Sequence, residues 1–121
     1  MKLSSTEIGR KAEQKALFFL EKRGLKILEK NYRSSLGEID LIMQDKDTTV
    51  FIEVRSRKNN SILNAVETID QRKRKKIVQT SLQYLQNTMK STNLYYRFDV
   101  ISIHGDINDK NIEWIKNAFD A

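Results

Sequence analysis

The sequence predicts an α/β protein in which helices cover a β-sheet, within one domain that spans residues 1–121. Two observations support this prediction. Apolar residues recur at helical spacing in two long segments, and several shorter segments are rich in β-branched and aromatic residues. The chain contains neither proline nor cysteine and shows no internal repeat. We therefore expect one unit without disulfides or thiolate metal sites.

The first helix is predicted over residues 5–23. Ser4 and Glu7 stand three residues apart, which is the spacing of a capping box at a helix N-terminus. Apolar residues then recur along one stripe as far as Leu20, and Gly24 suits the end of the helix.

Three strands should follow, over residues 25–32, 37–44 and 49–56. The second and third are separated only by a short polar segment, so they should pair as an antiparallel hairpin. In the simplest register, Met43 pairs with Val50.

After residue 56 the chain is predicted to form a loop, a second helix and further strands. We predict a mobile, basic loop at 56–64, a helix at 69–90, a strand at 95–103 and, at 112–119, a short strand that leads into one helical turn. The element order is α-β-β-β-α-β. The aromatic residues of the later segments are expected in the core rather than as platforms for bases; they are Tyr95, Tyr96, Phe98 and Trp114.

Two carboxylates on the central hairpin are the main functional signal. Strand alternation and the Met43–Val50 register place Asp40 directly opposite Glu53. Glu53 lies in a strand that is apolar on both faces, where an unpaired charge is costly. Two adjacent carboxylates repel each other unless a cation or a proton lies between them, and oxygen ligands of this kind suit Mg²⁺ or Mn²⁺.

Two other interpretations of the acidic residues stay open. Arg55 lies on the same strand face as Glu53, so the cluster could be an ion pair without chemistry, although buried ion pairs are poor stabilisers. As part of a metal site, Arg55 would instead lie within reach of a substrate phosphate. Glu13, at the edge of the apolar stripe of the first helix, is either plainly exposed or an additional carboxylate of the metal site.

The distribution of charge favours a polyanionic partner. The formal net charge is +6, and basic residues cluster directly after the third strand and in a run at 72–76. This run winds fully around a helix: Arg72 and Lys76 share a face, whereas Lys73 points nearly opposite to Lys75. Only some of these residues can contact phosphate, and the alternative is a solvated helix face.

The sequence contains no long apolar segment and no secretory signal, so we expect a cytoplasmic protein without membrane association.

At these residues the chain resembles the YraN family of small bacterial proteins, and the resemblance extends over nearly the full length. The matching segments are 9–16 (GRKAEQKA), 24–28 (GLKIL), 31–33 (NYR), 37–42 (GEIDLI), 51–57 (FIEVRSR), 72–73 (RK), 84–85 (YL), 97–100 (RFDV) and 117–119 (NAF).

The resemblance implies a restriction-endonuclease-like fold, with a central mixed β-sheet flanked by helices, as in Holliday-junction resolvases. It also implies that Asp40 and Glu53 are metal ligands and that Glu13 is the helix carboxylate of a catalytic site. Arg55 stands where the wider nuclease superfamily has lysine. A guanidinium does not lose its proton, so Arg55 could not act as a base toward water. Arg55 would instead bind phosphate, and the metal would activate the water.

The leading hypothesis is a Mg²⁺- or Mn²⁺-dependent nuclease that hydrolyses phosphodiester bonds in DNA, with branched or single-stranded DNA as candidate substrates. Asp40, Glu53, Arg55 and Glu13 form the predicted catalytic group. The predicted nucleic-acid contacts are Arg33, Arg57, Lys58, Arg72, Lys73 and Lys76. The alternatives are a nucleic-acid-binding module that has lost turnover through the Arg55 change, and a protein whose basic face meets an acidic protein partner. A homodimer is compatible with each.

Overall fold

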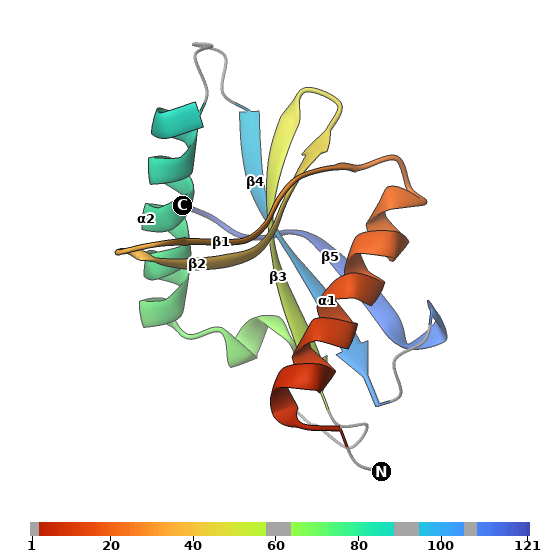
Figure 1. The fold of residues 1–121 in the computed structure, drawn as a ribbon. Coiled ribbons are helices and arrows are strands. Elements are labelled where there is room, and N and C mark those ends of the chain that lie inside the picture. The colour runs from red at the N-terminus through yellow and green to blue at the C-terminus, as the bar shows by residue number, and fades with distance from the viewer. Residues whose placement is uncertain (1–2, 58–63, 89–94, 106–108) are drawn as a thin grey trace.

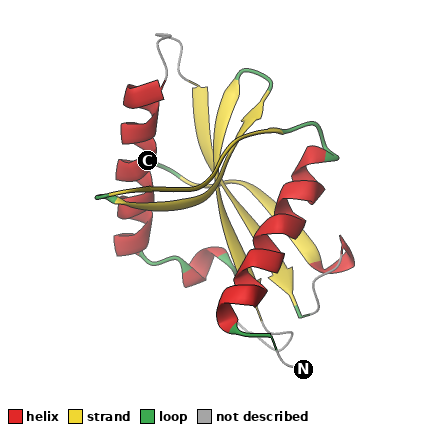
Figure 2. Cartoon of the chain, in the orientation of Figure 1, coloured by secondary structure: helices red, strands yellow, loops and turns green. Residues whose placement is uncertain are grey.

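The computed structural model describes residues 3–57, 64–88, 95–105 and 109–121. Two long helices and five strands make up most of this part of the chain (Figure 2). In chain order the elements are α1 (Ser5–Glu21), β1 (Lys26–Ser34), β2 (Gly37–Asp45), β3 (Thr48–Arg57), the 3₁₀ turn η1 (Val66–Thr68), α2 (Gln71–Thr88), β4 (Tyr95–His104), the 3₁₀ turn η2 (Asp109–Asn111) and β5 (Ile112–Phe119).

The five strands form one mixed sheet in the order β1-β2-β3-β4-β5. Strands β3 and β4 are parallel, and the other neighbours are antiparallel. A parallel pair needs a long crossover connection, and α2 lies within it. The two helices cover opposite faces of the sheet, α1 on one side and α2 on the other (Figure 1). The predicted α/β class with helices on a mixed sheet is confirmed.

The N-terminal helix has the predicted capping box. The Ser4 hydroxyl accepts a hydrogen bond from the Glu7 backbone N–H at 3.2 Å, and the Glu7 carboxylate accepts one from the Ser4 N–H at 3.2 Å. Gly24, just beyond the helix, has a φ of +96°. Glycine adopts this left-handed conformation without steric cost, so the chain turns here from α1 into the sheet.

The central hairpin has the predicted register, with Met43 paired to Val50 and Leu41 to Ile52. One further step along this ladder brings Asp40 beside Glu53. The predicted mobile loop at 56–64 lies mostly outside the described residues, as do positions 89–90 of the second predicted helix.

Strand β3 separates two apolar cores because its side chains alternate between the faces of the sheet. Val50 and Ile52 pack beneath α1, and Phe51 packs on the opposite face beneath α2. Both faces of β3 are therefore covered, and Glu53 in the same strand is only 5% exposed.

The prediction for residues 112–119 was wrong in its second half, because this segment is strand throughout. The carboxylate of Asp99, on β4, is fully buried and accepts hydrogen bonds from the Asn117 backbone N–H and the Trp114 indole, both at 2.9 Å. These bonds hold β5 against β4 through a register shift, where Asn117 takes a φ of +52°. The observed order is therefore the predicted one followed by a fifth strand.

The aromatic residues are mostly in the core, as predicted. Phe98 is buried, Tyr96 and Trp114 are half-buried, and Tyr95 is the exception at 53% exposure.

Candidate metal and nucleic-acid site

A cleft of about 420 Å³ lies where β2 and β3 meet the first turns of α2. Its described lining residues are Gly37, Glu38, Asp40, Glu53, Asp70, Arg72, Lys73, Lys76 and Ile77. The strands contribute the two predicted metal ligands, and the helix contributes three cations. The structure therefore brings together acidic and basic residues that the sequence places in separate motifs.

Asp40 is held close to Glu53 at the edge of the buried region. Its Oδ2 accepts a hydrogen bond from the Val54 backbone N–H at 2.8 Å. Burial, followed by the negative charge of Glu53 and a hydrogen bond with it, raises the pKa of Asp40 from 3.8 to about 8. The Val54 N–H opposes this shift. Two carboxyl groups held this close favour either a shared proton or a cation between them.

Glu53 has two basic neighbours, both at the same oxygen. Lys73 Nζ lies 2.8 Å from Glu53 Oε2, whereas an Arg55 terminal nitrogen lies 3.8 Å from it. Lysine from α2 is thus the close partner, and the arginine of the strand motif is the distant one. The Arg55 Nε is buried without a hydrogen-bond partner among the described residues. Glu53 is therefore ion-paired with Arg55, as that alternative expected, and Lys73 is a second and closer partner.

The donor set fits a divalent ion that also takes water and phosphate as ligands. Mg²⁺ is commonly held by one or two carboxylates while other oxygens complete its octahedron. Asp40 and Glu53 supply that number, and no described cation lies within ion-pair distance of Asp40. Among the described residues, no group of three or more acidic or histidine side chains is placed to hold a metal ion, so water and phosphate oxygens would have to complete the coordination.

Glu13 does not join the acidic pair in this cleft. It lines a separate hollow with Arg10 and Asn31, and it makes a hydrogen bond with Asn31. Burial raises the pKa of Glu13, and the negative charges of Glu38 and Glu53 add to the rise. Glu13 is thus close enough to influence the site electrostatically, although it is not one of the residues that line it.

The predicted nucleic-acid contacts fall into two groups. Arg72, Lys73 and Lys76 all line the cleft. Arg33 lies outside it and pairs with Glu38, at 3.4 Å. Arg57 is at the C-terminal end of β3 and is not among the described residues that line the cleft. The remaining predicted contact, Lys58, lies outside the described residues.

Two residues that sequence reasoning missed determine where α2 lies over the strands. The Asp70 carboxylate accepts a hydrogen bond from the Lys73 backbone N–H at 2.8 Å, which caps α2 and starts it at Gln71 rather than at 69. Gly37 permits close packing of β2 on α2, because a Cβ there would lie 2.9 Å from Thr80 Oγ1. The sequence contains a signal for each: Asp70 stands three residues before Lys73, which is the spacing of a helix cap, and Gly37 stands at the start of the acidic motif of β2.

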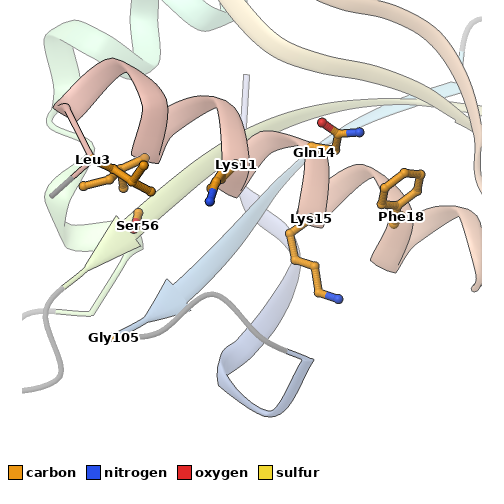
Figure 3. Close-up of a pocket in the computed structure, with 8 residues that line it drawn as sticks. Leu3, Lys11, Gln14, Lys15, Phe18, Ser56 and Gly105 are labelled. Carbon is orange, nitrogen blue, oxygen red and sulfur yellow. The ribbon is translucent and has the colours of Figure 1, made fainter. Parts of the chain in front are cut away.

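Another hollow, of about 600 Å³, lies along the side of α1, next to Ser56 of β3 and to Gly105, which follows β4 (Figure 3). Its described lining includes the apolar side chains of Leu3, Ile8 and Phe18 and the cations Lys11 and Lys15, without a carboxylate. It therefore lacks the oxygen ligands that make the cleft beneath α2 a candidate metal site.

The fold and the cleft together define a class of protein: an α/β protein with a mixed sheet, consistent with a nuclease-like fold, whose acidic pair lies at the sheet and faces a basic helix. No helix in the described ranges is long and apolar enough to cross a membrane.

Comparison with known proteins gives the family. The chain matches the family described as "Uncharacterised protein family UPF0102" over residues 12–103, and it belongs to this family, as the YraN-like motifs predicted. A UPF0102 protein of Pseudomonas syringae is 43% identical over 116 residues, which cover 95% of this chain and 94% of the relative. One of Colwellia psychrerythraea is 42% identical, with 96% and 91% covered. One of Vibrio campbellii is 40% identical, with 95% and 93% covered.

Proposed function

We propose that this protein is a Mg²⁺- or Mn²⁺-dependent nuclease that hydrolyses phosphodiester bonds in DNA, with branched or single-stranded DNA as candidate substrates. One observation carries the proposal: Asp40 and Glu53 lie together on neighbouring strands, where burial and the charge of Glu53 raise the pKa of Asp40 to about 8, in a cleft whose opposite wall is cationic. Residues that compete for a proton in this way are well suited to share a divalent ion.

Several residues of the cleft have a chemical part in this proposal. Asp40 and Glu53 would hold the ion, which supplies a Lewis acid for the scissile phosphate and a bound water of lowered pKa. The Val54 backbone N–H fixes the orientation of the Asp40 carboxylate at 2.8 Å. Arg72 and Lys76 would hold the phosphates on either side of the reacting one, as a sequence-independent electrostatic contribution.

Arg55 and Glu13 act at the edge of this group. Arg55 is not among the described residues that line the cleft, but its side chain is 25% exposed next to Glu53, so its guanidinium would donate to a phosphate oxygen that reaches the edge of the cleft. Glu13 would increase the negative potential at the carboxylates without ligating the ion, because it lines a different hollow.

The test is a panel of supercoiled, branched and single-stranded DNA, incubated with Mg²⁺ or Mn²⁺. We expect cutting that a chelator stops and that Asp40→Asn and Glu53→Gln abolish. Glu113→Gln, which removes an exposed carboxylate from β5, is the matched control and should cut normally. Cutting that persists in both Asp40→Asn and Glu53→Gln would show that the acidic pair is not the catalytic centre.

A nucleic-acid-binding module without turnover is the second candidate, and a specific observation favours it. Glu53 already has an ammonium partner at 2.8 Å, and the strand motif carries arginine in place of lysine. This candidate predicts metal-independent DNA binding with a steep dependence on salt, and no cutting of any substrate in the panel.

A cytoplasmic location and a homodimer stay predictions alongside both candidates.

A further inference from the structure

The ion pair between Lys73 and Glu53 joins a buried group to an exposed one. The Glu53 side chain is 6% exposed, whereas the Lys73 side chain is 46% exposed. The backbone of Lys73 is fixed by its hydrogen bond to the Asp70 cap. The Lys73 ammonium could therefore leave Glu53 by rotation of its own side chain, without movement of α2.

The position of the ammonium conflicts with a divalent ion at the same carboxylate. Lys73 Nζ lies 2.8 Å from Glu53 Oε2, and this oxygen faces Arg55 as well. A divalent ion shared by Glu53 and Asp40 would place like charges close together in a largely buried site, where screening is weak. Lys73 thus supplies Glu53 with a positive charge at the carboxylate where the divalent ion would supply one.

A substrate offers Lys73 an alternative partner. The cleft is also lined by Arg72 and Lys76, so a polynucleotide that binds there brings phosphate oxygens to the wall from which Lys73 extends. An ammonium is a flexible point charge that can pair with a carboxylate or with a phosphate.

We propose that Lys73 is a resident counter-ion of Glu53 that changes partner to a substrate phosphate, so that polynucleotide and divalent metal bind cooperatively. This inference rests on the proposed function, because it assumes that Asp40 and Glu53 hold the ion. Coupling between two ligands is reciprocal, so the metal must strengthen polynucleotide binding by the same factor.

The experiment measures Mn²⁺ binding to the purified full chain by the electron paramagnetic resonance signal of free Mn²⁺. Without nucleic acid, Lys73→Gln should bind Mn²⁺ about tenfold more tightly than the wild type, which is a typical size for such coupling. Lys75→Gln is the matched control: it removes the same charge from the same helix but from a different hollow, so we expect a change of at most about twofold.

A second arm adds a single-stranded phosphorothioate oligonucleotide, which keeps the backbone charge and resists hydrolysis. In the wild type it should strengthen Mn²⁺ binding by a larger factor than in Lys73→Gln, because only the wild type has an ammonium to displace. Lys73→Met, which keeps the apolar stem of the side chain, repeats both measurements if Lys73→Gln does not fold.

The outcomes separate this inference from the function on which it rests. Equal Mn²⁺ affinity in the wild type and the Lys73 variants, with binding lost in Asp40→Asn, would overturn the role of Lys73 and leave the metal site intact. No Mn²⁺ binding by any of these proteins would overturn the metal site and, with it, this inference.

Discussion

The forced proximity of Asp40 and Glu53 makes the stability of the metal-free protein depend on pH. Burial and the charge of Glu53 raise the pKa of Asp40 from 3.8 to about 8 in the folded protein. Between these two values the folded state keeps a proton on Asp40 that the unfolded chain has released. The folded state thus binds more protons than the unfolded state, and its stability must fall as the pH rises through this window.

The size of the effect follows from the linkage relation. One proton of difference changes the free energy of unfolding by about 1.4 kcal/mol per pH unit, so we expect a loss of about 3 kcal/mol between pH 5 and pH 7.5. This is a substantial part of the stability of an ordinary domain, which is about 5–15 kcal/mol. Above a pH of about 8 the contribution of Asp40 should level off.

The assay is urea denaturation of the chelator-treated protein over this pH range, for the wild type and for Asp40→Asn. Glu13 also has a raised pKa and contributes a slope of the same sign, so the difference between the two proteins isolates Asp40. The wild type should lose stability more steeply with pH than the variant. Parallel profiles would refute the reasoning, because Asp40 would then ionise as an ordinary surface carboxyl group does.

Magnesium should change the same profile if the proposed site is correct. Metal binding requires Asp40 without its proton, so the affinity for Mg²⁺ should rise from pH 5 towards a pH of about 8. With Mg²⁺ in excess, the wild type should therefore keep its stability across this range. A profile that is identical with and without Mg²⁺ would count against metal binding at this pair.

Three further predictions concern other parts of the structure. Gly37→Ala should lower the free energy of unfolding in urea by about 1–3 kcal/mol, because the new Cβ would lie 2.9 Å from Thr80 Oγ1. Gly9→Ala is the control: the space around Gly9 in α1 is open, so this change should raise the free energy of unfolding by about 0.5–1 kcal/mol. Equal effects of the two changes would contradict the close packing of β2 on α2. Asp99→Asn should cost about 3 kcal/mol and lower the melting temperature, because it removes the buried charge that several donors share; an unchanged melting temperature would argue against this network. Arg72→Gln should reduce the salt dependence of DNA binding by about one counter-ion without altering the midpoint of unfolding, and an unchanged slope would place the phosphates elsewhere.

Much of the fold could be predicted because local chemistry determines it. The turn between β2 and β3 is short, so its length alone sets the Met43–Val50 register and places the two carboxylates together. The start of α1 follows from a capping box that is local in sequence. Helical periodicity also separates Lys73 from Lys75, and they line different hollows.

What could not be predicted depends on contacts between distant segments. Residues 112–119 form one continuous strand because the Asp99 carboxylate binds the backbone of Asn117, and spacing within the segment does not reveal such a contact. The close partner of Glu53 comes from α2, since the packing of that helix on the sheet brings Lys73 to the strand. Glu13 was assigned to the right helix, but its hydrogen bond with Asn31 places it in another hollow.

The location of the cleft along the chain has a consequence for how sequences of this kind can diverge. Every described residue that lines the cleft falls between Gly37 and Ile77, so one continuous segment of the chain contains all the charged residues described as lining it. Apart from the electrostatic influence of Glu13 on Asp40, helix α1 and strands β4 and β5 act on those groups as the scaffold that keeps β2 and β3 covered and paired. Substitutions in the scaffold that preserve volume and apolar character should therefore leave the chemistry of the cleft unchanged, whereas recombination with a breakpoint inside this stretch would separate its acids from its bases.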